Sequence, residues 1–259
     1  MRLRLSIGAL VVCTAAARAQ DPVPLPAPPA VVVPPPVMAD TIPVWERPQG
    51  ALLRPGALTY TLSLHRPDGP IVSLGTRTVA VSDVTVGGTT AWLIAESRTG
   101  TAVVTTDSVL LRQSDLSPER WVATIGSGQL GASFTADSIF GAVQTYQGRA
   151  SFAVAIPKGV LLSAGMMERL IELLPLHVGF RAAAALMLVE GNAPRMEPAV
   201  IEVAREERLE WGGRGVECWV VVVRAGAVEQ RLWVSKESAR VVRSEQSLST
   251  GVYSAELQP

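Results

Sequence analysis

Short segments of alternating apolar and polar residues occupy most of the chain from residue 58 onward. In the segment Leu58-Thr59-Tyr60-Thr61-Leu62-Ser63-Leu64, a large apolar residue recurs at every second position. Successive side chains of a β-strand point to opposite faces, so this alternation predicts a strand with one buried face. Val, Thr, Ile and aromatic residues fill the later segments, as is typical of strands. The further strands that we expect cover residues 76–86, 90–97, 102–112, 120–126, 130–137, 149–156, 199–211, 216–224, 228–235, 240–247 and 252–257.

Short turns join these segments and indicate how the strands are paired. Gly87-Gly88 and Gly212-Gly213 are typical of two-residue hairpins, Ala225-Gly226 is a further turn, and Pro67-Asp68-Gly69 is a turn rich in the usual turn residues. Neighbouring strands are therefore expected to pair in an up-and-down antiparallel sheet. A twisted sheet of more than about ten strands rarely stays flat, so we expect strong curvature into a half-barrel.

One segment, residues 163–174, breaks the strand pattern. Its large apolar residues recur at helical spacing, and Pro175 ends the run because proline disfavours a helical residue before it. A helix of three turns is not stable alone in water, so we expect it to pack on the concave face of the sheet. The predicted fold class is mainly β, a strongly curved antiparallel sheet with one amphipathic helix. The apolar side of this helix holds Met166, Met167, Leu170, Ile171, Leu173 and Leu174, and the opposite side holds Gly165, Glu168, Arg169 and Glu172.

Two structural alternatives stay open. Residues 180–190 contain alanines that favour a helix, but their flanking glycines also fit a fully buried strand, which we prefer. An all-β sandwich is the main rival to the half-barrel, and it would place the helix outside the core.

The first 19 residues resemble a secretory signal peptide. Arg2 and Arg4 precede a short apolar core at residues 5–12, and Ala17-Arg18-Ala19 offers small residues for cleavage. The apolar core is too short to span a bilayer, which needs roughly 20 residues. We therefore predict export to the periplasm or cell envelope of a bacterium, with no transmembrane span after cleavage.

A Pro-rich segment separates this signal from the strand pattern. Residues 21–36 contain eight prolines, which favour an extended and disordered chain. We expect a disordered linker at residues 20–52 and a single domain at residues 53–259. The linker is a spacer, a disordered tail without a partner, or a ligand for a proline-binding module, and we favour the last two over the spacer.

Cysteine usage and charge exclude several classes of protein. Cys13 follows Val12, whereas the lipid-modified cysteine of bacterial lipoproteins follows a small residue, so an apolar role is favoured over lipidation. Cleavage after residue 19 leaves Cys218 alone, so no intramolecular disulfide can form. Cleavage also removes three arginines, which takes the formal net charge from zero to minus three. Nucleic-acid binding needs a basic surface, so we exclude it.

No group of residues in the sequence predicts catalysis, a metal site or a cofactor. His177 follows the helix by three residues, where a role at the helix end is favoured, and His65 lies beside a turn. Gly126-Ser127-Gly128 fits a hairpin turn, and Cys218 falls on the apolar face of its strand. We therefore expect a protein that is not an enzyme. The candidate ligand-binding residues are the methionines and Leu170 of the helix and three strand tryptophans, namely Met166, Met167, Leu170, Trp92, Trp219 and Trp233. Ordinary core packing is the alternative for each of them.

Three short motifs resemble a known family. They are residues 173–180 (LLPLHVGF), residues 215–220 (GVECWV), and residues 233–235 (WVS) followed by residues 240–243 (RVVR). With the strand pattern, they resemble bacterial envelope proteins that carry domain of unknown function 3108, which are similar in fold to the lipoprotein carriers and receptors LolA and LolB. The resemblance implies a half-barrel with a helical lid and an apolar interior, and it transfers no functional residue.

Together these observations predict an exported envelope protein that binds a lipid or another apolar ligand in its half-barrel. The alternative is a structural or protein-interaction module of the envelope with a filled core and an envelope protein as its partner. A third hypothesis is an enzyme that uses Cys218 or a serine.

Overall fold

The computed structural model describes residues 42–45, 48–100, 105–146, 148–156, 159–162, 164–190 and 193–259. The predicted signal peptide, Cys13 and the Pro-rich run at 21–36 lie outside the described residues. None of the described helices is long and apolar enough to cross a lipid bilayer.

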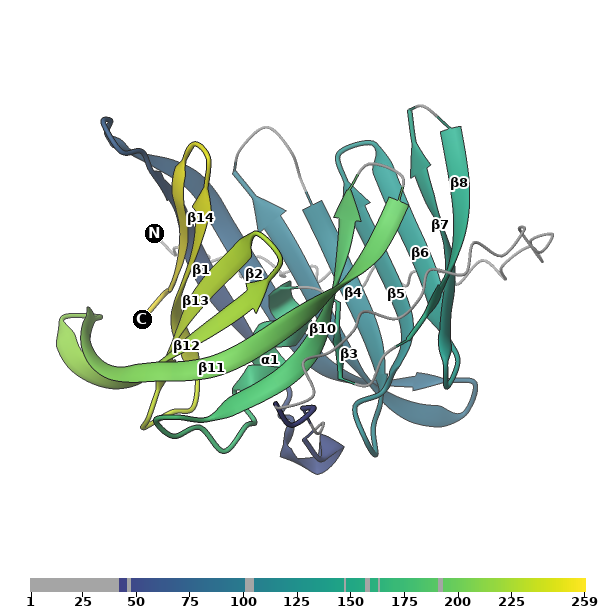
Figure 1. Cartoon of the computed structure of the whole chain (residues 1–259), viewed down its shortest axis with the longest axis horizontal. Helices are drawn as coiled ribbons and strands as arrows, with labels where there is room; N and C mark the ends of the chain where they lie inside the picture. The colour runs from purple at the N-terminus through teal and green to yellow at the C-terminus, as the bar shows by residue number, and fades with distance from the viewer. Residues whose placement is uncertain are drawn as a thin grey trace, which may run out of the picture.

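All described strands belong to one sheet of fifteen strands (Figure 1). Its order is β8-β7-β6-β5-β4-β3-β2-β1-β15-β14-β13-β12-β11-β10-β9, and every pair is antiparallel except the short parallel pair β9–β10. The strands are β1 (Gly56–His65), β2 (Ile71–Val86), β3 (Thr89–Thr99), β4 (Thr105–Arg112), β5 (Pro118–Ile125), β6 (Gly128–Phe134), β7 (Ser138–Thr145), β8 (Gly148–Ala155), β9 (Val160–Leu161), β10 (Arg181–Glu190), β11 (Ala193–Trp211), β12 (Arg214–Ala225), β13 (Val228–Ser235), β14 (Val241–Leu248) and β15 (Gly251–Leu257).

Among the described residues, this architecture confirms the prediction of a mainly β chain with one α-helix. Residues 181–190 form strand β10, as preferred over a helix. Gly87 and Gly88 close the β2–β3 hairpin between the paired residues Val86 and Thr89, and their φ angles of 58° and 83° suit glycine at both turn positions. The sheet is not closed, because no pairing among the described residues joins β8 to β9. The two halves of the sheet nevertheless approach each other, since β8 contacts β11.

The sequence pattern missed strand β7 and the two-residue strand β9, and it placed the starts of β2 and β11 too late. Strand β7 was not predicted because Gly141 and Ala142 interrupt its apolar alternation, and both have low strand propensity. Strand β11 begins six residues before the expected residue 199, because Pro194 and Pro198 are atypical of strand interiors.

The helix α1 (Ala164–Ile171) is shorter than predicted. Its expected first residue, Ser163, lies outside the described residues. At the other end, the N–H groups of Leu173 and Leu174 donate to the carbonyls three residues earlier, each at 3.1 Å. These tighter bonds replace the last helical turn before Pro175.

Part of the segment that was expected to be a linker packs on the domain. Trp45 is 4% exposed, and its backbone N–H donates to the backbone carbonyl of Ala183 at 2.7 Å. The short 3-10 helix η1 (Gly50–Leu52) follows, and its Gly50 is buried. Packing on the sheet therefore begins before the predicted domain start at residue 53. Trp45 contacts strand β10, which lies more than a hundred residues later in the chain and is not indicated by the local sequence.

Candidate functional site

The polar side of α1 is buried, contrary to the amphipathic prediction. Glu168, Arg169 and Glu172 are 0%, 2% and 8% exposed. A polar helix face normally lies in solvent, but here each of the three charged side chains meets an opposite charge from its own or another element. Side chains on both sides of the helix are therefore buried.

Arg77 on β2 forms the centre of this buried charge cluster. Its two terminal nitrogens donate to the two carboxylate oxygens of Glu168, both at 2.8 Å. Its guanidinium also lies over the ring of Tyr60, 5.3 Å from the centroid. Burial alone would lower the pKa of Arg77, but Glu168 and Glu96 outweigh burial and raise it. The pair is therefore a two-bond attachment of the helix to the sheet.

Glu96 on β3 joins the cluster to a second arginine. Its Oε2 lies 3.2 Å from Arg77 Nε, and its Oε1 accepts a hydrogen bond from Arg98 Nε at 2.8 Å. Burial favours the protonated form of Glu96, yet the two arginines lower its pKa below the ordinary value. Glu96 is therefore a carboxylate.

A second group of buried polar atoms lies at the C-terminal end of α1. The Tyr60 hydroxyl accepts from Arg169 at 2.9 Å and donates to the carbonyl of Val241 at 3.2 Å. Glu172 pairs with Arg169 at 2.7 Å and accepts from the N–H of Val241 at 2.7 Å. Arg240 is a further partner of Glu172 at 3.7 Å. These bonds link α1 to the strands β1 and β14.

The stability of the protein is expected to fall between pH 5 and pH 7.5 because of Glu172. Burial, with a smaller contribution from Glu168, raises the pKa of Glu172 to about 7, although Arg169, the Val241 N–H and Arg240 act against the rise. The folded state therefore holds a proton that the unfolded state releases near pH 4.5, so folding is favoured at low pH and loses up to about 3 kcal/mol as pH rises through 7. Urea unfolding at pH 5, 6, 7 and 8 measures this slope.

Glu172→Gln is the matched variant, because its amide oxygen still accepts from the Val241 N–H. Its stability should change by less than about 1 kcal/mol over the same range. An equally steep slope in this variant would assign the pH dependence to another group.

Beside the helix, the two parts of the sheet enclose a cavity of about 580 Å³ that is partly open to solvent. Its volume lies in the range of small-molecule sites, about 300–1,000 Å³. One wall comes from β3 to β7, and the opposite wall comes from β10 and the segment just before α1. The apolar lining residues are Trp121, Ala123, Leu130, Val143, Leu162, Met187 and Leu188, and the polar ones are Glu96, Arg98, Thr105, Thr106, Asp107, Gln129 and Thr145, with Gly128 completing the lining.

The charged residues of this cavity come from two adjacent strands. Glu96 and Arg98 on β3 connect the cavity to the buried charge cluster, while Asp107 on β4 accepts a hydrogen bond from the Trp121 indole N–H at 3.1 Å. Trp121 is 4% exposed, so its orientation is fixed by packing as well as by this bond. The cavity thus combines an apolar wall with a few polar groups of fixed position, as binding sites do.

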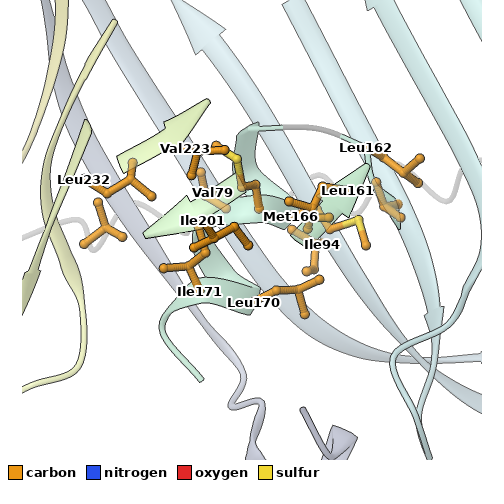
Figure 2. Packing of buried hydrophobic residues seen from close by; sticks show 14 of the residues in the cluster. Val79, Ile94, Leu161, Leu162, Met166, Leu170, Ile171, Ile201, Val223 and Leu232 are labelled. Atoms are coloured by element: carbon orange, nitrogen blue, oxygen red, sulfur yellow. The ribbon is translucent and has the colours of Figure 1, made fainter. Parts of the chain in front are cut away.

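The three candidate residues of the helix lie in the packed core. Met166 and Leu170 are fully buried and Met167 is 2% exposed. In Figure 2, Met166 lies among Ile94 and Leu161, and Leu170 lies close by. None of the three lines the 580 Å³ cavity, so the expected hollow under the helix is filled by side chains. Leu162, which does line the cavity, lies at one end of this cluster (Figure 2).

The three candidate tryptophans do not line the cavity, and Trp219 and Trp233, at neighbouring positions of the paired strands β12 and β13, point to opposite faces of the sheet. The indole N–H of Trp92 donates to the carbonyl of Gly50 at 3.1 Å, and Trp92 borders a separate surface hollow. Trp233 donates to Glu207 at 3.1 Å. Trp219 is half-buried, with Lys236 Nζ 4.0 Å from its ring centroid. Ligand contact by these six residues remains a prediction, and the structure does not bring them into one site.

The residues that do form the cavity were missed as a group. Trp121 falls within the strand expected at residues 120–126, but Asp107, Leu162 and Met187 carry no local signal. They come from β4, from the segment before α1 and from β10, and only the long-range pairing of strands brings them together. The alternation within β5, which points Trp121 and Ala123 to one face, is the one sequence signal that indicates part of this wall.

Cys218 is fully buried, as its strand position predicts. Burial, together with Glu207 and Glu217, raises the pKa of its thiol to about 11. No group of three or more metal-binding side chains occurs among the described residues.

Alkylation of Cys218 in the folded protein is expected to be slow. The raised pKa lowers the thiolate fraction at pH 8 by about a hundredfold relative to an ordinary thiol. Labelling by iodoacetamide, followed by mass spectrometry of the intact protein, should therefore be at least about a hundredfold slower without urea than in 8 M urea. Equal rates would revive the hypothesis of a reactive thiol.

No family model matches the chain, and no curated protein sequence matches it either. Among solved structures, the chain is similar to the crystal structure of the hypothetical lipoprotein YmcC from Escherichia coli (K12). The similarity covers 79% of this chain and 86% of that chain, at 16% sequence identity and a TM-score of 0.32. The resemblance to domain of unknown function 3108 is therefore not confirmed, and a likeness this distant carries no inference about function.

Proposed function

We propose that this chain is exported to the bacterial cell envelope and holds an apolar ligand, such as a lipid chain, without catalysing a reaction. In this proposal the sheet forms a half-barrel, with α1 and the 580 Å³ cavity on its concave side. The cavity is the observation that carries the proposal. Its apolar wall suits a hydrocarbon chain, and its charged residues suit the polar end of the ligand.

The sequence favours export to the cell envelope, and the packed core favours ligand binding without movement of the helix. The features of residues 1–19 favour export, and a protein of the envelope meets lipids. The filled core around Met166 and Leu170 means that ligand uptake does not require the helix to leave the sheet. The apolar ligand therefore belongs beside the helix rather than beneath it.

Binding of N-phenyl-1-naphthylamine, an uncharged dye whose fluorescence rises in apolar surroundings, tests this proposal. The purified protein should bind the dye with a dissociation constant in the micromolar range. About one dye per chain is expected, because a cavity of about 580 Å³ has room for a single small molecule. Lipid extraction and mass spectrometry of protein purified from the envelope should then identify the natural ligand.

Two variants on strand β5 locate the binding site. Ala123 faces the cavity, so Ala123→Phe fills part of it and should weaken dye binding at least about tenfold. The neighbouring Val122 is 37% exposed on the opposite face, and Val122→Phe should leave binding unchanged. Absence of dye binding, or equal effects of the two variants, would contradict the proposal.

A second candidate function is a structural or protein-interaction module of the envelope. The dense packing around α1 favours it, because the helix stabilises the sheet without any ligand. Protein crosslinked to an envelope partner, with an empty cavity and no dye binding, would support this function over ligand binding.

A further inference from the structure

We propose that the outer face of strands β5 to β8 carries a separate binding site, a groove that binds an acidic glycan. The groove has a volume of about 600 Å³ and is partly open to solvent. The four strands lie side by side at one end of the sheet (Figure 1). The groove holds the outward side chains of β5, such as Val122, whereas the 580 Å³ cavity holds the inward ones, such as Ala123. This inference therefore does not rest on the binding of an apolar ligand in the cavity.

The register of the strands explains why a groove forms on this face. Val122 pairs with Gly131, which pairs with Ala142, so the middle row of the face has small side chains on β6 and β7. A β-carbon added at Gly131 would meet no atom within 4 Å, so this position is open. Arg120 lies on the row to one side, and Arg149 lies on the row to the other side. The longer side chains of these two rows enclose a groove that runs across the strands.

The two arginines of the groove have no counter-charge. Neither Arg120 nor Arg149 forms an ion pair with any residue that the structure describes, and no acidic side chain is among the described lining residues. Every other described arginine in a strand pairs with a carboxylate, except Arg214, which lies over the ring of Trp211. Guanidinium groups bind carboxylates and phosphates through paired hydrogen bonds. The groove is therefore complementary to an anionic ligand.

The positions of the two arginines indicate an extended ligand. Arg149 on β8 lies on the same row as Thr124 on β5, and Arg120 lies four residues before Thr124. With about 4.8 Å between strands and about 3.4 Å per residue, the Cα atoms of the two arginines are about 20 Å apart along the face. A chain that carries several separate anionic groups matches this spacing better than a single phosphate does.

The other groove residues suit a chain that is rich in hydroxyl groups. The hydroxyls of Thr124 and Ser133 form no hydrogen bond with a described residue, and the amide side chains of Gln129 and Gln144 are exposed. Hydroxyl and amide groups both donate and accept, as the hydroxyls of a sugar require. The ring of Phe140 is 46% exposed and offers an apolar surface to the face of a sugar ring.

Other anionic partners match the groove less well. A peptide that adds a strand needs an open sheet edge, whereas this groove lies on a sheet face. Acidic peptide motifs are bound by clusters of arginines, and the two arginines here are far apart. Attachment to an anionic membrane uses about four to eight basic residues, but only Arg120 and Arg149 are basic among the described lining residues. An acidic glycan is therefore the ligand class that the groove matches best.

Isothermal titration calorimetry with tetragalacturonic acid and maltotetraose at pH 7 tests the inference. The two probes have the same number of sugar rings, but only tetragalacturonic acid carries a carboxylate on each ring. It should bind at least about tenfold more tightly than maltotetraose, because its carboxylates pair with the two arginines. Raising the salt concentration from 50 to 300 mM should weaken this binding at least about threefold, because the arginines are exposed.

Three variants locate the site on this face. Arg120→Gln/Arg149→Gln should weaken the binding of tetragalacturonic acid at least about tenfold. Arg205→Gln/Arg231→Gln, an equal change of charge on β11 and β13, should alter it less than about twofold. Gly131→Phe keeps every charge and fills the groove, so it should also weaken binding at least about tenfold. Circular dichroism should show an unchanged sheet in all three variants.

The outcomes separate this inference from the proposed function. Equal binding of the two probes, or equal losses in the two arginine variants, overturns the glycan site. Binding of hexaglutamate as tight as that of tetragalacturonic acid also overturns it, because the partner would then be an acidic protein. Absence of binding by tetragalacturonic acid in a protein that still binds N-phenyl-1-naphthylamine overturns the glycan site alone. Glycan binding without dye binding overturns only the proposed function.

Discussion

Replacing Arg77 by methionine is expected to lower the free energy of unfolding by about 3–5 kcal/mol. The substitution removes both hydrogen bonds to Glu168, which is 0% exposed, and the contact with Glu96. Methionine fills most of the volume of the arginine stem, so the loss comes chiefly from the buried carboxylate of Glu168, which loses its ion pair with Arg77, while Glu96 keeps its ion pair with Arg98. Urea unfolding followed by tryptophan fluorescence measures the change.

Two further variants separate this cause from general disruption. The double variant Arg77→Met/Glu168→Leu should be less destabilised than the sum of its single variants, by about 1–3 kcal/mol, because no carboxylate is then left facing a missing partner at Glu168. Arg112→Met removes an exposed pair with Asp115 at 3.5 Å and should cost less than about 1 kcal/mol. Strict additivity in the double variant would show that Arg77 and Glu168 do not act as a pair.

Replacing Leu170 by alanine is expected to cost about 2–5 kcal/mol of stability. Leu170 is fully buried in the cluster that joins α1 to the sheet (Figure 2), so truncation removes apolar contacts and leaves a cavity among side chains that cannot close around it. The same unfolding measurement applies, and circular dichroism at low urea concentration should show an unchanged sheet.

Leu173→Ala is the matched control, because Leu173 lies one helical turn later and is only half-buried. Its cost should be less than half that of Leu170→Ala, in proportion to the smaller area that it buries. Equal costs would mean that the helix is held by its C-terminal turn rather than by the core contact of Leu170.

The strands and hairpins were predictable because their determinants are local. The alternation of residues 58–64 and the glycine pair at 87–88 act within a few residues, and the structure has a strand and a hairpin at these positions. Strand β7 escaped prediction for the same reason, since Gly141 and Ala142 remove the local signal while the neighbouring strands still supply its hydrogen bonds. The pattern of apolar residues therefore predicts a strand only when the residues of that strand determine its structure, and it fails when the neighbouring strands determine it.

The helix illustrates the limit of such patterns. Its position and its apolar side follow from spacing, but the same spacing predicts that Glu168, Arg169 and Glu172 face solvent. They are buried because their partners, such as Arg77 and Tyr60, lie about a hundred residues away in the chain. A charged side chain that finds a buried counter-charge need not stay in water, and no periodicity within the helix encodes that partner.

The sequence by itself determined that this chain is mainly β, that its strands follow one another in hairpins, and that one helix must be buried. These results rest on side-chain periodicity and turn chemistry, which act between near neighbours. Only the tertiary structure decided that the space under Met166 and Leu170 is filled and that the open cavity lies beside the helix, lined by Trp121, Asp107 and Met187. The physical reason is that a cavity is what remains after all side chains are packed, so its place depends on contacts between strands that are distant in the chain.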